Sequence, residues 1–455
     1  MRQRPACDPT SSAIVLVIRL TLIVTLTLVA QPVTAYEVPA APLTFTWQAC
    51  LGGDSDDVGQ AICPTPNGQW MVAGYANSRD HDMTNHHDGD VSAYWGRGDF
   101  LVARYDNTGK KVWSKCFGGT GTERALAIAA VGNDTYWVAG YTDSNEGDVS
   151  GNHGGNDAWV IKVSGSGSLL ARKCLGGGNS EIACGVQATG DGGCIVVGTT
   201  DSPDGDVKGL IGQNDAWVVK LDSALNIQWQ KCLGTKGDDL ACAVDNAAGG
   251  YVVGGRIARG PGNQPAPWCL GNGMVAKLAA SGATEWLVDL GGMDDDTVLA
   301  VHPNAAGGFI CAGYNRSPST AGHQGGSDAW VFALDANGGK VWEKSLGGSA
   351  DDTATSIRQL NDGGYIMTGE TASFNGDVGG VHTDRPDLWL VRLGAAGDIH
   401  WQRCLGGRDP DVGNDLWPTS DGGYVVTGGA SPRGEGDIKS GHAGFDLWIF
   451  KAWPM

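Results

Sequence analysis

Among the residue types whose side chains could bind a metal or take part in a reaction, aspartate recurs most regularly along the chain. Carboxylates gathered with carbonyl groups in one loop are what Ca²⁺ requires, because it takes about six to eight oxygen ligands. The candidate calcium ligands are Asp148, Asp157, Asp206, Asp215, Asp377 and Asp387. The alternative is that each carboxylate caps a turn by accepting hydrogen bonds from nearby backbone N–H groups. Repetition from copy to copy favours this second interpretation.

Histidine recurs beside the same aspartates. His153, His323, His382 and His442 each stand four or five residues before the Asp of a D-x-W motif. Equivalent positions in separate copies of a repeat do not converge on one metal ion. We therefore expect these histidines to form hydrogen bonds within their own loops.

Two segments, residues 77–98 and 256–273, depart from the repeated pattern. The first holds His81, His86 and His87 among carboxylates, so it is either a transition-metal site or a solvated loop. A loop that breaks a repeat is a better functional candidate than one that obeys it. Binding energy concentrates in a few aromatic and arginine side chains. The candidate ligand-binding residues on these segments are Tyr94, Trp95, Arg256, Arg259 and Trp268.

Catalytic signatures are missing from the sequence, which contains no G-x-S-x-G elbow, no H-E-x-x-H pair and no phosphate-binding loop with lysine. We assign no catalytic residue. An enzyme whose site is assembled from several repeats stays open as an alternative.

The elements that carry these residues follow a repeat of about sixty residues. Its anchor is a tryptophan followed, five positions later, by a glycine. Anchors occur at Trp47, Trp113, Trp229, Trp286, Trp342 and Trp401, and a seventh copy has Ala171 in the tryptophan position. Spacings of 56 to 66 residues separate successive anchors.

Each copy contains four short runs typical of β-strands, separated by turns rich in Gly, Asn and Asp. This predicts an all-β fold, a seven-bladed β-propeller with four antiparallel strands per blade over residues 36–455. The segment from Thr44 has the pattern of a fourth strand, and the one from Asp446 has that of a third. We predict that the N-terminal strand joins the C-terminal blade and closes the ring.

One copy shows the whole motif, with Trp342, Gly347, Gly348, Asp352, Ala354, residues 362–365, Gly369, Ser373, residues 376–378, Asp387, Trp389 and Arg392. This pattern resembles β-propeller repeat proteins exported by bacteria and archaea, most of which have no assigned activity. Residues 334–342 also resemble the tryptophan-docking motif of quinoprotein propellers. Because the chain has no Cys-Cys dipeptide, that likeness implies strand packing and no quinone cofactor.

Composition excludes some partners. The formal charge of −19 repels nucleic-acid phosphates, so we expect no nucleic-acid partner. Five of the 12 cysteines share the fourth-strand register, which neighbouring blades hold too far apart for disulfides. We expect them to be buried thiols, although local pairs such as Cys174 with Cys184 stay open.

The N-terminus resembles an export signal. Arg2 and Arg4 precede an apolar run over residues 20–30, and small residues end at Ala35. We predict a signal peptide at 1–35, with an uncleaved membrane anchor as the alternative, and no later membrane span. The predicted function is a secreted or cell-surface binding or scaffold protein that recognises a protein or glycan through its Asp-rich loops. The alternative is an extracellular polysaccharide hydrolase or lyase with its site at the mouth of the central channel. Neither needs a cofactor beyond possible Ca²⁺.

Overall fold

The computed structural model describes residues 43–83, 86–87, 98–258, 271–431 and 436–454. Chain contacts separate two units, Met1–Tyr36 and Glu37–Met455. All described residues belong to the second unit, and every regular element among them is a β-strand. No helix in this part of the chain is long and apolar enough to cross a membrane.

The strands form seven four-stranded sheets, here numbered as blades 1 to 7. Blade 1 contains β2 (Asp57–Pro64), β3 (Trp70–Ala76), β4 (Asp99–Tyr105) and β5 (Lys111–Phe117). Blade 2 contains β6 (Glu123–Gly132), β7 (Thr135–Thr142), β8 (Asp157–Ser164) and β9 (Leu169–Leu175). Blade 3 contains β10 (Glu181–Ala188), β11 (Cys194–Thr200), β12 (Asp215–Leu221) and β13 (Ile227–Leu233). Blade 4 contains β14 (Leu240–Ala247), β15 (Gly250–Ala258), β16 (Gly271–Ala279) and β17 (Thr284–Leu290).

The remaining blades follow the same order. Blade 5 contains β18 (Asp296–Pro303), β19 (Phe309–Asn315), β20 (Asp328–Leu334) and β21 (Lys340–Leu346). Blade 6 contains β22 (Asp352–Gln359), β23 (Tyr365–Thr371), β24 (Asp387–Leu393) and β25 (Ile399–Leu405). Blade 7 contains β26 (Val412–Pro418), β27 (Tyr424–Ala430), β28 (Asp446–Pro454) and β1 (Leu43–Leu51).

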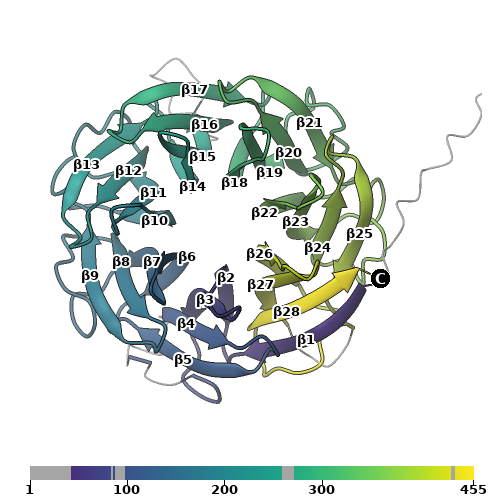
Figure 1. The fold of residues 1–455 in the computed structure, drawn as a ribbon, viewed down its shortest axis with the longest axis horizontal. Helices are drawn as coiled ribbons and strands as arrows, with labels where there is room; N and C mark the ends of the chain where they lie inside the picture. Colours follow the sequence, from purple (N-terminus) through teal and green to yellow (C-terminus); the bar gives the residue numbers. More distant parts are fainter. Residues whose placement is uncertain (1–42, 84–85, 88–97, 259–270, 432–435, 455) are drawn as a thin grey trace, which may run out of the picture. The chain divides into compact units, whose positions relative to one another are not determined.

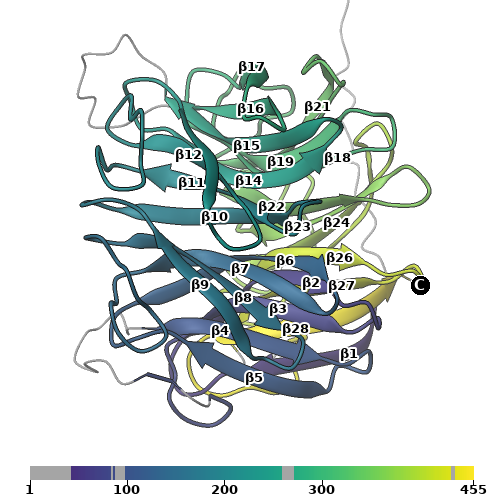
Figure 2. The ribbon, with the colours of Figure 1, turned by 60° about the vertical axis from the view of Figure 1, so that its left-hand side comes forward.

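The seven blades stand around a central channel (Figure 1), and the first strand of each blade lies innermost. In the turned view, strands of neighbouring blades stack above one another (Figure 2). The ring closes where β1 pairs with β28, antiparallel from Leu43↔Pro454 to Leu51↔Leu447. The predicted seven-bladed propeller and its closure by the N-terminal strand are therefore confirmed.

Neighbouring blades contact each other through a tryptophan ring that packs on a turn glycine of the next blade. The indole N–H of Trp113 donates to the carbonyl of Gly165 at 2.9 Å, and its ring covers Gly167 in the next blade. Gly167 has a φ of 79°, which its missing side chain permits and which brings the turn against the ring. Trp47, Trp229 and Trp286 donate to equivalent carbonyls at 3.1 Å. This explains why the anchor and the turn glycine recur together.

The two ends of the blades differ. Turns between the first and second strands and between the third and fourth are tight, as at residues 360–364 and 394–398. Connections between the second and third strands and between blades lie at the opposite end, because the strands alternate in direction. The strand ends that the irregular segments 77–98 and 256–273 connect, Ala76 with Asp99 and Ala258 with Gly271, are at this end, which we call the loop face; residues 84–85, 88–97 and 259–270 lie outside the described residues.

The ten cysteines within the described ranges are free thiols, and most are buried. Cys116, Cys174, Cys232 and Cys404 are among the buried ones, as expected for that register, whereas Cys50 is partly exposed. The open possibility of a Cys174–Cys184 disulfide is wrong for this structure.

Candidate functional site

One position of the innermost strands departs from the repeat more than any other. Every first strand begins with, or directly follows, a buried carboxylate, from Asp57 in blade 1 to Asp411 in blade 7. Six residues after that carboxylate, the seven blades carry different side chains. In blade order they are Cys63, Ala129, Gln187, Asp245, His302, Arg358 and Trp417. All seven lie within three residues of the end of their strand, where a tight turn follows.

The polar members of this set, Gln187, Asp245, His302 and Arg358, form a continuous network with Asp415 of β26, and we call these five residues the channel arc. Gln187 Nε2 donates to Asp245 Oδ1 at 2.7 Å, and His302 Nδ1 lies 2.8 Å from Asp245 Oδ2. Arg358 Nη1 contacts His302 Nε2, and Arg358 Nη2 lies 3.5 Å from Asp415 Oδ1. Blades 3 to 7 are thereby linked side chain to side chain.

The arc continues into blade 1 and is bounded by an aromatic ring. Asp415 Oδ2 accepts the backbone N–H of Ile62 at 3.0 Å, and Ser356 Oγ donates to Asp415 Oδ1 at 2.7 Å. The guanidinium carbon of Arg358 lies 4.9 Å from the centre of the Trp417 ring. Each member of the arc is therefore fixed by a neighbour from another blade.

Charge and burial set the protonation states. Burial works to raise the pKa of Asp245, but hydrogen bonds from His302 and Gln187 and the charge of Arg358 hold it below its ordinary value. Burial, followed by the charge of Arg358, lowers the pKa of His302. At neutral pH Asp245 is ionised and His302 is neutral, with Nδ1–H donating to Asp245 and Nε2 accepting from Arg358.

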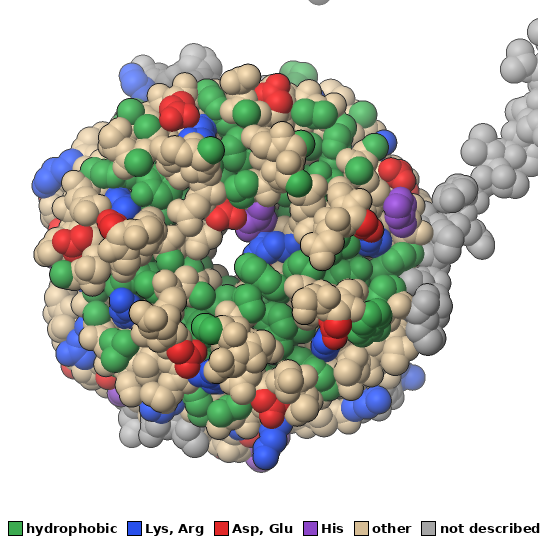
Figure 3. Space-filling model, viewed as in Figure 1, with side chains coloured by type: hydrophobic (Ala, Val, Ile, Leu, Met, Phe, Trp, Pro, Cys, Tyr) green, Lys and Arg blue, Asp and Glu red, His purple; other side chains and the backbone are tan. Residues whose placement is uncertain are grey.

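The arc is accessible from the channel. The side chains of Asp245, His302 and Arg358 keep 20%, 21% and 17% of their surface exposed. Figure 3 shows acidic, histidine and basic side chains side by side at the rim of the central opening, where Figure 1 places β14, β18 and β22. A ligand at this mouth would meet carboxylate acceptors, amide and guanidinium donors and an indole ring within one arc.

The carboxylates that begin the first strands cap the connections between blades. In all seven blades the carboxylate accepts the backbone N–H four residues earlier, at 2.6–2.9 Å. Among the predicted calcium ligands, Asp157, Asp215 and Asp387 are fully buried and accept the N–H groups of His153, Ile211 and His382. Burial raises the pKa of all three.

The other three predicted calcium ligands behave differently. The backbone N–H groups of Asp148, Asp206 and Asp377 donate to glycine carbonyls at 2.8 Å. Asp206 acts electrostatically on Asp157 of the preceding blade, so aspartates of neighbouring blades approach each other across a junction. If these aspartates bind Ca²⁺, the ion would lie between aspartates of two neighbouring blades, such as Asp157 and Asp206, and not among aspartates of one loop.

The recurring histidines make the expected hydrogen bonds within their loops. Nδ1 of His153 and of His382 lies 2.6 and 2.7 Å from the aspartate that follows, and Nδ1 of His323 lies 3.1 Å from Asp328. His442 donates through its backbone N–H to Asp446 at 2.7 Å.

Histidines of the first irregular segment divide between two places, since His86 and His87 both lie within 4.0 Å of Asp99 Oδ2 and His81 does not join them. Nδ1 of His87 lies 2.9 Å from Asp99 Oδ2, and both ring nitrogens of His86 contact backbone carbonyls. His81 instead joins Asp54 and Asp80, with ligand atoms within 4.8 Å of one another. Over the described ranges this exposed group is the one set of three metal-ligating side chains at that spacing.

Of the five predicted ligand-binding residues, only Arg256 falls within the described ranges. Its Nε lies 2.6 Å from Asp295 Oδ1, and 14% of its side chain is exposed. It therefore already bridges blades 4 and 5. Tyr94, Trp95, Arg259 and Trp268 lie outside the described residues.

No protein-family model matches the chain. No curated protein sequence matches it either. Among solved structures, a protein of unknown function from Bacteroides caccae is 13% identical, with a TM-score of 0.38 over 67% of this chain and 89% of its own. Sqt1 from Chaetomium thermophilum is 11% identical, with a TM-score of 0.46 over 91% of this chain and 100% of its own. The Pan2 WD40 domain of Neurospora crassa is 11% identical, with a TM-score of 0.39 over 73% and 93%.

Proposed function

We propose that this chain is an exported carbohydrate-binding propeller whose site is the channel arc with Trp417. One observation carries the proposal. At a single position of the innermost strands, beside the channel, four successive blades have the different polar residues Gln187, Asp245, His302 and Arg358. Planar amide, carboxylate and guanidinium groups can each exchange two hydrogen bonds with neighbouring sugar hydroxyls. The exposed part of Trp417 offers an apolar face for ring C–H groups.

The network's protonation favours binding over bond cleavage. Glycoside hydrolysis generally needs one carboxylic acid that is protonated beside one that is ionised. Asp245 is held ionised, and both ring nitrogens of His302 are already engaged. Asp245 could therefore accept a proton, but neither Asp245 nor His302 is poised to donate one as the general acid at neutral pH. Polysaccharide hydrolysis or elimination is therefore the second candidate.

Export is supported by the sequence at residues 1–35, where a basic start, an apolar run and small residues follow one another. An exported chain with a hydroxyl-recognising site would meet polysaccharide outside the cell. N-terminal sequencing of the secreted protein would test this part of the proposal, and a start near Tyr36 is expected.

The binding test is a glycan array probed with residues 36–455, followed by product analysis of every hit. Retention without new reducing or unsaturated ends supports a binder, whereas new ends support the enzyme. Asp245→Asn should weaken a hit by about tenfold or more, because one charge-assisted hydrogen bond is worth about 1.5–3 kcal/mol.

Matched variants on the loop face decide between the two surfaces. Trp95→Ala and Trp268→Ala should leave the affinity unchanged if the channel arc is the site. Loss of binding in these two variants, with Asp245→Asn unaffected, would place the site on the loop face instead.

A further inference from the structure

Five junctions between blades share a tryptophan-on-glycine contact, in which the ring of Trp47, Trp113, Trp229, Trp286 or Trp342 covers a turn glycine of the next blade. At the junction of blades 2 and 3, Ala171 occupies the tryptophan position. Leu225 occupies the glycine position, and its N–H donates to Asp222 O at 3.0 Å as Gly109 does to Asp106 at 3.1 Å. Both members of the pair are therefore replaced together.

Leu225 takes over part of the missing indole's place. It keeps the left-handed φ of the glycine, at 64°, which is costly for a residue with a branched side chain. It is 5% exposed and packs in the same hydrophobic cluster as Ala171. An isobutyl group is smaller than an indole, and a pocket of about 370 Å³ lies at this junction. We call it the junction pocket.

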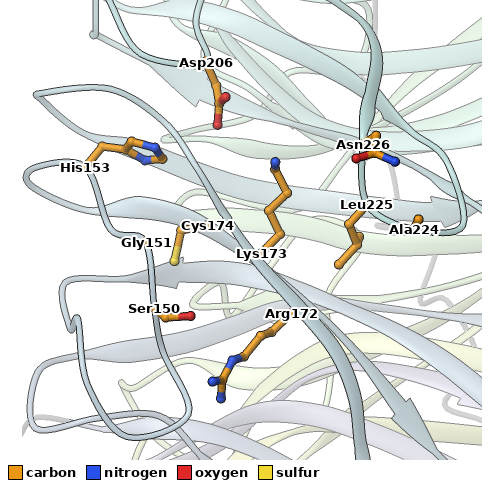
Figure 4. Close-up of a pocket in the computed structure, with 10 residues that line it drawn as sticks. All are labelled: Ser150, Gly151, His153, Arg172, Lys173, Cys174, Asp206, Ala224, Leu225 and Asn226. Carbon is orange, nitrogen blue, oxygen red and sulfur yellow. The ribbon is translucent and has the colours of Figure 1, made fainter.

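The junction pocket carries hydrogen-bonding groups from four segments of the chain, one of which is the turn with Asn226 between β12 and β13 (Figure 4). Arg172 and Lys173 come from β9, His153 from the loop before β8, and Asp206 from the loop before β12. Figure 4 shows the Lys173 ammonium pointing between His153 and Asn226 and toward Asp206, while Arg172 extends the opposite way. His153 has Nδ1 engaged with Asp157 at 2.6 Å, which leaves Nε2 for a ligand.

The charges select the class of ligand. The lining holds two cationic side chains and one carboxylate, in a chain whose formal charge is −19, and Lys173 is the cation that points toward Asp206. Asp206 and Asn226 can accept from or donate to hydroxyl groups, and Leu225 supplies an apolar floor. A volume of about 370 Å³ is in the range of pockets that hold small ligands.

We propose that the junction pocket binds an acidic sugar, a uronate residue whose carboxylate pairs with Lys173 and whose hydroxyls meet Asp206 and Asn226. The pocket lies by the outer strand β9, whereas the channel arc lies on the innermost strands. The proposal therefore does not depend on carbohydrate binding in the channel. Variants of one site leave the other intact.

Calorimetric titration of residues 36–455 with a tetragalacturonate tests the proposal, beside a neutral glucose tetrasaccharide and sodium sulfate. Lys173→Met should weaken the tetragalacturonate by about tenfold or more, the loss expected for one charge-assisted hydrogen bond. The matched control is Lys231→Met, which removes a lysine at the same register of blade 3 whose Nζ donates to Thr284. It should change nothing.

Restoring the repeat gives a second, independent test. The double variant A171W/L225G rebuilds the contact found at five other junctions and places an indole on the turn that carries Ala224, Leu225 and Asn226 of the pocket lining. It should melt at or above the wild-type temperature, because the strained Leu225 is removed, and it should lose the tetragalacturonate. Unchanged binding in this variant, equal affinity for the neutral sugar, or competition by sulfate at the same concentration would overturn the proposal.

Discussion

Two carboxyl groups at the blade junctions have pKa values well above the ordinary range. Burial, with the neighbouring charge of Asp446 adding to it, raises the pKa of Asp57 from 3.8 to about 6. Burial, with Asp387 adding to it, raises the pKa of Asp411 to about 7. Each lies where the third strand of one blade meets the first strand of the next. These groups bind a proton more tightly in the folded protein than in the unfolded chain.

Stability should therefore depend on pH in a defined direction. The contribution of Asp57 and Asp411 is fully present below the unfolded pKa near 3.8, and it is lost as pH rises through 6 to 7. The melting temperature should fall between pH 5 and pH 8, and Asp411→Asn should flatten that slope. Calorimetric melts across this range are the measurement. Asp362→Asn, in an exposed turn, is the control and should keep the wild-type slope.

A second prediction for single residues concerns whether Ca²⁺ binding to the recurring aspartates stabilises the fold. Because Asp157, Asp215 and Asp387 already accept backbone N–H groups, the melting temperature should not change on adding EDTA or Ca²⁺. Thermal melts at several Ca²⁺ concentrations measure this directly. A rise of the melting temperature with Ca²⁺, abolished in Asp157→Asn, would show that these carboxylates are ligands.

At the scale of elements, the repeat predicts strands well because its cues are local. Tryptophan anchors, Asn/Asp-Gly turns and buried third strands each belong to one blade, and all appear where the pattern placed them. The channel arc was missed because its members are of four different residue types and lie 56 to 58 residues apart. Variation at one register of an otherwise regular repeat was the available signal. The exchange of Trp for Ala171 was visible in the sequence, but its compensation by Leu225 depends on a contact between blades.

The whole molecule depends on one strand pairing that joins the two ends of the propeller. Deleting residues 43–50 removes most of β1 and leaves the edge of β28 unpaired. We expect this truncation to aggregate or to lose its cooperative melt, as measured by light scattering and calorimetry. A truncated protein that melts as the full propeller does would show that the ring does not require β1.

The closing pair also determines how the ring responds to force. Leu43 and Pro454 are partners at the same end of the β1–β28 ladder, so both chain ends leave the propeller at one point. Tension applied between them loads the hydrogen bonds one after another, as in a zipper, instead of shearing the whole ladder at once. The pairing that closes the resting ring is therefore the one that tension on both ends loads first, and we expect β1 to separate from blade 7 before any other blade unfolds.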